Sequence, residues 1–319
     1  MTTREKILNS LTPILAHPTF VTIDNERITG IAKEFMESPV PSWDNDLQLL
    51  GTPEETVQYY LFLDSINFCF WAPKGKTRWE YSINGEWVGG YYAYSKAIKD
   101  AFLKDPRLFD AEYLSQIPEE DFGSIFAAGR NELLLMEERL EIIRENFRIL
   151  REHFDGQALN ILKEAGMDAD RIVSLLLEHF PSFDDSVDWN GHQIFLLKRA
   201  QIFVSDLSFA GLSELTITNL GNLTVFADYK LPQILESFGV LRYSSELDAD
   251  VVNEILIPAG SQKEVELRAS SIAAIEQIRN EIERLGREIS TNELDWILWV
   301  KAKATTFSKP HHKTLTTFY

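Results

Sequence analysis

The amino-acid sequence predicts a mostly α protein that carries one small β-hairpin insertion. Apolar side chains recur at helical spacing through most of the chain, which indicates amphipathic helices. The dipeptide Asn84-Gly85 indicates a tight hairpin turn, because alternating aromatic and polar residues precede it. No repeat of fixed period, low-complexity tract or clear linker divides the sequence. We therefore expect one domain over residues 1–319, built either as a single compact unit or as two helical lobes.

The first half of the chain predicts a series of helices around this hairpin. In the second of these helices Ile28, Ala32 and Phe35 fall on one face, and Pro39 ends the pattern. Pro181 closes the last of them in the same way. The predicted helices cover residues 3–16, 24–37, 54–63, 91–103, 119–126, 132–154, 157–164 and 168–180.

Two segments of the second half combine helical patterns with charged residues. Residues 192–206 (HQIFLLKRAQIFVSD) predict a buried helix whose apolar surface is interrupted by Lys198 and Arg199. Residues 226–243 place Asp228 where an apolar segment turns into a helix. Backbone N–H groups are unpaired at a helix N-terminus, and together with the helix dipole they keep a carboxylate ionised.

The cations of the first segment need partners, because an apolar helix cannot solvate them. Asp206 and Asp228 are both candidates, and an ion pair between Lys198 and Asp228 would hold that carboxylate charged and oriented. The alternative is that Lys198 extends to solvent while Asp228 is only a helix cap. The spacing alone does not decide between these two interpretations.

Composition narrows the class of ligand. The chain has 319 residues, 45% of them hydrophobic, which is enough for a large core. Its formal charge of −18 argues against a protein that follows a nucleic-acid backbone, because such proteins carry basic stripes. A few local cations can still hold one small anion. We therefore expect a small-molecule ligand rather than a nucleic acid.

Cysteine usage and hydropathy favour a cytoplasmic protein without membrane contact. Cys69 is the one cysteine, which excludes an internal disulfide and fits a reducing compartment. The N-terminal segment lacks the apolar core of a signal peptide. No run approaches the roughly 20 apolar residues that span a bilayer.

The block DSINFCFW at residues 64–71 sets aromatic side chains around single polar residues, which suits a pocket for a flat heterocycle. In an extended strand Phe68 and Phe70 would share one face, so not every residue of the block could line one pocket. The alternative is ordinary core packing, the commoner role of aromatic clusters. We expect Cys69 to be buried and without chemistry. The candidate ligand-binding residues here are Asp64, Asn67, Phe68, Phe70 and Trp71.

Four hydrogen-bond donors follow Pro310, and they could together hold a phosphate group. Lys313 would supply the charge, and Thr314 and a histidine would donate hydrogen bonds. The alternative is a basic terminal segment with no fixed role. Adjacent histidines without a second group of ligands make a poor zinc signature, so we predict no metal site. The four residues are His311, His312, Lys313 and Thr314.

Several long and unusual motifs follow one another along the chain. They are DSINFCFW, GYYAYSKAIKDAF, KRAQIFVSDL at residues 198–207, FADYKLPQ at residues 226–233, EVELRA at residues 264–269, and PHHKTLTTFY at residues 310–319. In this order, and over nearly the whole chain, they resemble the queuosine salvage proteins, the queuosine 5′-phosphate N-glycosylase/hydrolase family.

The resemblance implies hydrolysis of queuosine 5′-monophosphate to release queuine, with no cofactor. It also implies a fold similar to helix-hairpin-helix DNA glycosylases, with Lys198 and Asp228 as the catalytic pair. The separation of these two residues is longer than in the DNA enzymes, and no Gly-rich hairpin precedes Lys198. Further pocket candidates are Asp206, Tyr229 and Arg268, whereas Glu264 and Glu266 are expected to be surface charges.

The chemistry can be argued from the bond itself. An N-glycosidic bond breaks through a ribosyl cation-like state, so a fixed carboxylate near the anomeric carbon stabilises the charge and can activate water. Asp228 is the first candidate for this role, while the sequence identifies no proton donor for a deazapurine leaving group. Two alternatives are an inactive nucleotide-binding or scaffold protein, and a glycosylase acting on a modified base within nucleic acid. The charge of −18 opposes the latter.

Overall fold

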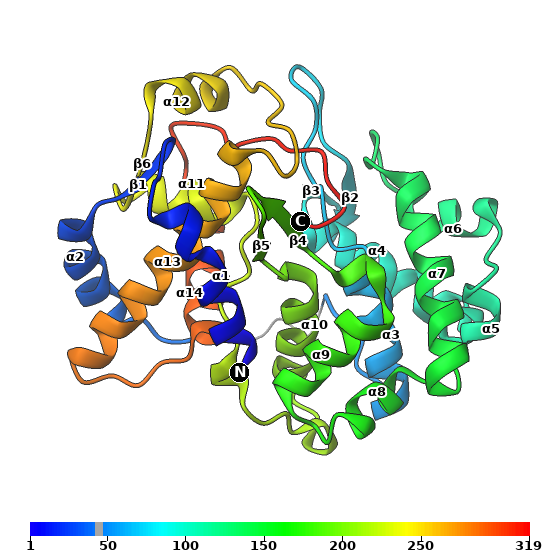
Figure 1. Ribbon diagram of the computed structural model, residues 1–319. Helices are drawn as coiled ribbons and strands as arrows, with labels where there is room; N and C mark the ends of the chain where they lie inside the picture. Colours follow the sequence, from blue (N-terminus) through cyan, green and yellow to red (C-terminus); the bar gives the residue numbers. More distant parts are fainter. Residues whose placement is uncertain (42–46) are drawn as a thin grey trace.

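The computed structural model describes residues 1–41 and 47–319, and helices make up most of them, which confirms the mostly α prediction (Figure 1). Short antiparallel strand pairs and a few 3₁₀ turns complete the secondary structure. The α-helices are α1 (Thr3–Leu15), α2 (Asn25–Met36), α3 (Pro53–Ser65), α4 (Tyr91–Lys104), α5 (Ala111–Leu114), α6 (Glu119–Phe126), α7 (Met136–Phe154), α8 (Ala158–Glu164), α9 (Ala169–His179), α10 (Lys198–Phe209), α11 (Lys230–Ser237), α12 (Ser245–Val252), α13 (Gln262–Arg284) and α14 (Thr291–Ala304). The strand pairs are β1 (Val21–Ile23) with β6 (Leu241–Tyr243), β2 (Glu80–Ile83) with β3 (Glu86–Gly89), and β4 (Ser186–Trp189) with β5 (His192–Phe195).

Local capping explains why the helices of the first half are predictable. Thr52 accepts the backbone N–H of Glu55, and the Glu55 carboxylate accepts the N–H of Thr52 in return. Pro53 follows at the first helical position, where its missing N–H costs nothing. The helix predicted from residue 132 begins instead at Met136, because Leu135 adopts a left-handed φ of 60°.

The predicted hairpin is confirmed as the pair β2 and β3. Its turn residues, Asn84 and Gly85, have φ values of 53° and 85°, a conformation that asparagine and glycine tolerate best. A second hairpin, β4 and β5, turns at Asn190 and Gly191 and was not predicted. The sequence analysis also assigned no helix to residues 245–304, which hold α12, α13 and α14.

The buried helix predicted over residues 192–206 is wrong in its first part. Residues 192–195 form β5, and α10 begins only at Lys198. Leu197, between them, has a left-handed φ of 53°, which stops the helical pattern from extending backward. Lys198 therefore lies at the N-terminus of a helix and not in its middle.

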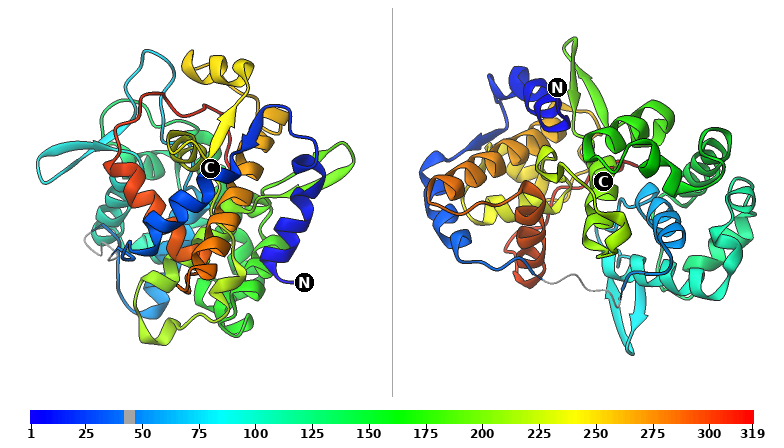
Figure 2. Two further views of the ribbon diagram at one scale, coloured as in Figure 1. Left: turned by 90° about the vertical axis from the view of Figure 1, so that its left-hand side faces the viewer. Right: turned by 90° about the horizontal axis from the view of Figure 1, so that it is seen from below.

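The helices gather in two groups. Figure 1 and Figure 2 show α2, α11, α13 and α14 on one side of the molecule and α3 to α9 on the other. The strand pair β1 and β6 ties the start of the chain to the first group, with Val21 opposite Tyr243. α10 packs against α3 and α9 of the second group.

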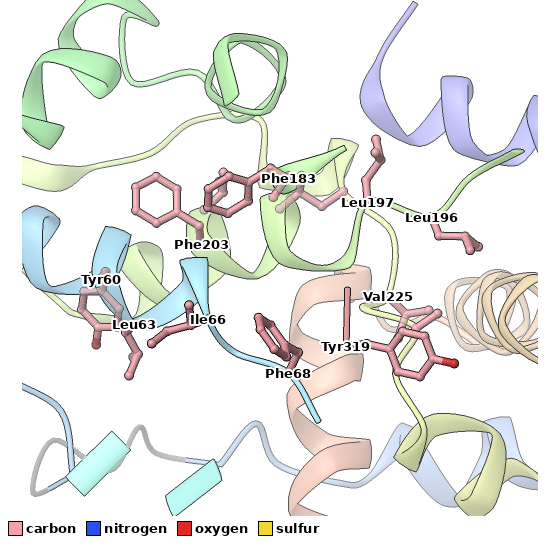
Figure 3. Packing of buried hydrophobic residues seen from close by; sticks show 14 of the residues in the cluster. Tyr60, Leu63, Ile66, Phe68, Phe183, Leu196, Leu197, Phe203, Val225 and Tyr319 are labelled. Atoms are coloured by element: carbon pink, nitrogen blue, oxygen red, sulfur yellow. The ribbon is translucent and has the colours of Figure 1, made fainter. Parts of the chain in front are cut away.

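One continuous hydrophobic core runs through both groups. Figure 3 shows part of this core: Phe68, from the segment after α3, lies between Ile66 on one side and Tyr319 and Val225 on the other. Leu197 packs into the same region. Because the segments that precede α10 and α11 are part of this core, their backbones are held rigidly.

Glu264 and Glu266 on α13 are buried, so the expectation of surface charges is wrong. One carboxylate oxygen of Glu266 accepts the backbone N–H groups of Phe20 and Val21, at 2.6 and 3.0 Å. Buried backbone N–H groups need partners, and this carboxylate supplies them for the turn before β1. The spacing of α13 alone could not reveal a partner more than 240 residues away.

Candidate functional site

A cavity of about 550 Å³ opens where the two groups of helices face each other. Its walls come from the segment after α3, the β2–β3 hairpin, α10, α11, α14 and the C-terminal segment. Small-molecule pockets occupy about 300–1,000 Å³, so this cavity could hold a nucleotide. Of the residues predicted from sequence, its walls include Asn67, Phe68, Phe70, Trp71, Lys198, Asp206, Asp228, Tyr229, His311 and Lys313.

Asp228 lies just before α11, as predicted. Its Oδ1 accepts the backbone N–H groups of Lys230 at 2.7 Å and Leu231 at 3.0 Å. A helix leaves these N–H groups unpaired in its first turn, so the two bonds both cap the helix and orient the carboxylate. The second oxygen, Oδ2, accepts no hydrogen bond from the described residues. The backbone thus fixes the carboxylate while one oxygen stays available to a ligand.

Lys198 is only 4% exposed, and its Nζ donates to the backbone carbonyl oxygen of Asn67 at 2.8 Å. Among the described residues, Lys198 forms no ion pair with Asp228, because its ammonium donates to the carbonyl oxygen of Asn67 instead. The predicted ion pair is therefore not formed. Burial lowers the pKa of Lys198, and the negative charges of Asp228 and Asp64 oppose that shift. Lys198 and Asp228 therefore interact across a distance and not through a direct contact.

Two more carboxylates border the cavity. Asp206, which was predicted, accepts the Tyr91 hydroxyl at 3.0 Å, and Asp295, which was not, accepts the backbone N–H of Phe226 at 3.1 Å. Burial raises the pKa of Asp206 well above its ordinary value and raises that of Asp295 to about 7. We call Asp206, Asp228 and Asp295 the acidic cluster.

The segment after α3 is not an extended strand, which changes the expectation for its aromatic residues. Cys69 has a φ of 54°, and this left-handed residue breaks the alternation of a strand. Phe68, Phe70 and Trp71 consequently all border the cavity. Cys69 itself is buried, as expected, and burial raises the pKa of its thiol to about 11.

The aromatic wall is held from behind by further contacts. The guanidinium of Arg139 lies 4.2 Å from the ring centre of Phe68 and donates to the Phe68 carbonyl oxygen at 2.5 Å. Phe70 packs against Tyr94, with ring centres 4.8 Å apart. A wall fixed in this way offers a flat ligand a preformed stacking surface.

Asp64 is fully buried behind the cavity wall and does not border it. Its Oδ1 accepts the side-chain amide of Asn67 at 3.1 Å, while its Oδ2 has no hydrogen-bond partner among the described residues. Burial raises its pKa to about 7, against the opposing effects of Asn67 and Lys198. Asp64 therefore does not contact a ligand in the cavity. Its carboxylate orients the side chain of Asn67, which does border the cavity.

The four donors of the C-terminal segment do not converge on one point. His311 and Lys313 border the cavity, whereas His312 and Thr314 are buried on the other side of the segment. The segment is not helical, and side chains of an extended chain alternate between two faces. The prediction that all four together hold a phosphate is therefore wrong.

Of these four residues, the two that border the cavity, His311 and Lys313, already have partners within the protein. Lys313 forms an ion pair with Glu254 at 2.6 Å and donates to the Ala72 carbonyl oxygen at 2.6 Å. His311 stacks on Tyr229, with ring centres 4.4 Å apart, and its Nδ1 faces the backbone carbonyl oxygen of His312 at 2.7 Å. Burial lowers the pKa of His311 to about 3, so its imidazole is neutral and its Nε2 can accept a hydrogen bond.

Arg268, predicted as a pocket residue, does not border the cavity. Its guanidinium is 2% exposed and binds both carboxylate oxygens of Asp185, at 2.9 and 2.5 Å. Its Nε donates to the backbone carbonyl oxygen of Ala227 at 2.9 Å, directly before Asp228. The motif that contains Arg268 does lie near the site, but the Arg268 side chain contacts the backbone next to Asp228 and does not reach the cavity.

The sequence analysis missed one whole wall of the cavity, the inner face of α14. Asn292, Asp295, Trp299 and Lys303 border the cavity, and their spacing of three or four residues places them on one helical face. Trp296 stacks on Trp299, with ring centres 5.1 Å apart and planes inclined by 14°. This wall could have been predicted from the sequence, because one face of the helix combines a tryptophan with an asparagine, an aspartate and a lysine.

Several cations at the cavity have no carboxylate partner among the described residues, and we call three of them, Arg78, Lys230 and Lys303, the basic cluster. The ammonium of Lys303 lies 2.9 Å from the ring centre of Tyr92. Burial and the charges of Arg78 and Lys230 lower the pKa of Lys303 to about 7. Burial and the charge of Arg78 likewise lower the pKa of Lys230, against Asp228. Mutual repulsion of this kind is what an anion would relieve.

Residues 1–41 and 47–319 contain neither a metal-binding cluster nor a membrane-spanning helix. No group of three or more His, Cys, Asp or Glu side chains in these ranges is arranged to hold a metal ion. No helix in the same ranges is both long enough and apolar enough to cross a bilayer.

Comparison with known proteins places the chain in a family. Residues 47–319 match the family model described as "Queuosine salvage protein". A protein from Sphaerobacter thermophilus is 36% identical over 98% of this chain and 97% of its own length. A mouse protein is 30% identical over 94% of each chain, and one from Dictyostelium discoideum is 35% identical over 83% of this chain and 79% of its own length.

All three relatives carry the name "Queuosine 5′-phosphate N-glycosylase/hydrolase". The match covers the segments that build the cavity walls, from the block after α3 to the C-terminal segment. The similarity is not confined to one motif, because the family model matches residues 47–319 and the relatives align over most of their length. The resemblance seen in the sequence motifs is therefore confirmed, and the chain belongs to the queuosine salvage protein family.

Proposed function

We propose that this chain hydrolyses the N-glycosidic bond of queuosine 5′-monophosphate and releases queuine and ribose 5-phosphate. The observation that carries the proposal is the carboxylate of Asp228, held by two backbone N–H groups and facing a cavity of nucleotide size. The names of the curated relatives supply the substrate class. No metal or cofactor takes part in the proposed reaction.

Asp228 would act on the ribose. Breaking the bond leaves positive charge on the anomeric carbon, and the ionised carboxylate stabilises it. The free Oδ2 then accepts a proton from water, whose oxygen bonds to that carbon. The electrons of the broken C–N bond leave with the base, which takes up a proton. Because Oδ1 is already held by Lys230 and Leu231, the carboxylate needs little reorganisation during the reaction.

Lys198 would be the electrostatic partner of Asp228. A buried ammonium beside the acidic cluster would place positive charge near the Asp228 carboxylate without direct contact. In this proposal the fold is related to helix-hairpin-helix DNA glycosylases, with a lysine and an aspartate each at a helix N-terminus. The support is the position of Lys198 at the start of α10 and of Asp228 before α11.

The base would lie against the aromatic wall, with its polar groups toward the other acids. Phe68, Phe70 and Trp71 offer ring faces for stacking. Asp206 and Asp295 border the same cavity, so they replace Asp64 as the acids that accept hydrogen bonds from the base and its cationic side-arm amine. Burial outweighs the opposing charge of Lys198 and raises the pKa values of both acids, and such an amine would add further positive charge beside them.

The basic cluster would hold the 5′-phosphate. Arg78, Lys230 and Lys303 have no carboxylate partner among the described residues, whereas Lys313 has Glu254. Lys230 follows Asp228 by two residues, so a ribose placed at Asp228 would have its 5′ side near this cluster. The binding of a phosphate by these three cations is compatible with the overall charge of −18, because recognition depends on the local field.

The test is to incubate the purified protein, after treatment with a chelator, with queuosine 5′-monophosphate, queuosine or guanosine 5′-monophosphate. Free base is followed by chromatography with mass detection, and the Asp228→Asn variant is the matched control. We expect queuine to be released mainly from queuosine 5′-monophosphate by the wild type alone. Intact nucleotide after long incubation, with binding shown by calorimetry, would instead assign the chain to the class of binding proteins.

A further inference from the structure

The two candidate catalytic residues lie on different helices, and one buried ion pair contacts the backbone beside both of them. This ion pair joins Arg268 on α13 to Asp185 in the turn before β4. Two parallel hydrogen bonds connect them, and both side chains are at most 4% exposed. Neither residue borders the cavity. Any role in the reaction must therefore be exerted through other residues.

On one side, Asp185 fixes the start of α10. Its Oδ2 accepts the backbone N–H of Lys198 at 3.0 Å, and its carbonyl oxygen accepts the N–H groups of Leu196 and Leu197 at 3.0 and 3.2 Å. The residue before the helix, Leu197, has no side chain able to cap it and adopts a left-handed φ of 53°. Asp185 therefore supplies from a distance the cap that α10 lacks in its own sequence.

On the other side, Arg268 fixes the approach to α11. Its Nε donates at 2.9 Å to the carbonyl oxygen of Ala227, which is the peptide group that leads into Asp228. The guanidinium also lies 4.3 Å from the ring centre of Tyr319. The backbone carbonyl oxygen of Tyr319 accepts the N–H of Cys69 at 2.9 Å. The same arginine is thus linked to the aromatic wall as well.

We infer that the Arg268–Asp185 pair is a positioning device that fixes Lys198 and Asp228 relative to each other, and so controls turnover rather than substrate affinity. This inference rests on the proposed function. Arginine suits the task because its planar guanidinium offers five donors in fixed directions, and here they reach the backbone at Ala227 and the carboxylates of Asp185 and Glu264 at once. A lysine could make only part of this set of contacts.

The first test is the Asp185→Asn variant, whose amide oxygen can still accept from Lys198 but whose charge and forked pairing are lost. Calorimetric titration with ribose 5-phosphate counts the folded sites, so turnover is expressed per intact site. We expect kcat per site to fall roughly 100-fold, with KM changed by less than about twofold, because small misplacements of reacting groups act on turnover.

The second variant, Arg268→Ala, leaves a space for a guanidinium ion added at millimolar concentration. Partial recovery of kcat by guanidinium, without recovery by equal concentrations of ammonium or sodium chloride, would indicate positioning by this group. If Arg268 contributed only to folding, guanidinium would not restore kcat per intact site. If Arg268→Ala does not fold, the result for Asp185→Asn decides.

The matched control is Arg4→Met, which breaks the ion pair between Arg4 and Glu276. Glu276 lies on the same helix, α13, but among the described residues neither side chain has a hydrogen bond or ion pair with the segments before α10 or α11. We expect a lower Tm with unchanged kcat per site. Unchanged kcat per site in Asp185→Asn as well would overturn the inference while leaving the proposed function intact. Absence of base release by the wild type would overturn both.

Discussion

The acidic and basic clusters of the cavity meet at the N-terminus of α11 and differ in how they are held. In the acidic cluster Asp206 is buried and Asp228 and Asp295 are half-buried, and the three carboxylates accept bonds from backbone N–H groups and a tyrosine. The basic cluster includes Arg78, which is exposed, and Lys303, whose ammonium lies against the ring of Tyr92, with no carboxylate partner in the described chain. In the proposed function, the acidic cluster would be preorganised for chemistry, whereas the basic cluster would be adaptable and provide charge for binding.

The pKa shifts of the two clusters point in opposite directions for one physical reason. Burial raises the pKa of Asp206 and Asp295 and lowers that of Lys230 and Lys303. In each cluster like charges add to the effect. Lys198 offsets the shifts of Asp206 and Asp295 only in part, and Asp228 offsets that of Lys230 only in part. A ligand with a cationic amine and an anionic phosphate would add countercharge to each cluster.

The largest effect is expected from the acidic side, with Asp228→Asn. Asparagine caps helices as well as aspartate does, so the fold should persist while the negative charge is lost. We expect kcat to fall by about 1,000-fold with near-normal binding of queuosine 5′-monophosphate. Single-turnover release of base and calorimetric binding measure the two quantities. Turnover close to that of the wild type would reduce Asp228 to a helix cap.

A smaller effect is expected from Lys198→Met, which keeps the length of the side chain and removes its charge. The field acting on Asp228 is lost, together with the bond to the carbonyl oxygen of Asn67. We expect kcat to fall about 100-fold. Arg199→Met is unsuitable as a comparison because Arg199 supports the core through the carbonyl oxygens of Ser65 and Ser182. A Lys198→Met enzyme with wild-type kcat would show that this ammonium only fills space.

Substitutions in the basic cluster should raise KM, and only for the phosphorylated substrate. Lys230→Met removes one cation of the basic cluster, and loss of one charge-assisted bond should raise KM for the monophosphate about 10-fold. KM for the unphosphorylated nucleoside should not change. Lys313→Met is the matched control, because Lys313 borders the same cavity but is neutralised by Glu254. Equal effects of both variants would favour the C-terminal segment as a phosphate site after all.

Sequence reasoning succeeded where structure is local and failed where it depends on distant partners. Asp228 was predictable because a helix cap involves residues two and three positions away. The hairpin at Asn84-Gly85 was predictable for the same reason, and the overlooked Asn190-Gly191 carried an equal signal that the apolar run after it masked. The burial of Glu266 and the role of Arg268 depend on contacts with Phe20 and Asp185, which no spacing rule reveals.

The candidate site shows the same division. The aromatic block was expected to split between two faces, and only the left-handed φ of Cys69 brings Phe68, Phe70 and Trp71 together. The donors after Pro310 were read as one cluster, yet the extended chain sends alternate side chains in opposite directions. Residue type predicted the chemistry of the cavity better than it predicted which side chains would reach it.

The smallest expected effect is a pH dependence that separates the two clusters. Lys303 has a pKa lowered to about 7, so its charge is present below that pH and is lost as the pH rises through it. The ratio of kcat/KM for queuosine 5′-monophosphate to that for queuosine should therefore fall about threefold between roughly pH 7 and 9. Ionisations of the acidic cluster affect both substrates and cancel in this ratio.

Lys303→Met should flatten that profile and lower the ratio already at pH 7. The second ionisation of the phosphate lies near pH 6, which is why the comparison is confined to higher pH. A profile that stays steep in Lys303→Met would assign the titration to Lys230, whose pKa is also lowered by burial and by the charge of Arg78. A flat profile in the wild type would mean that phosphate recognition does not depend on the partly deprotonated lysines, and the adaptable role assigned to the basic cluster would be lost.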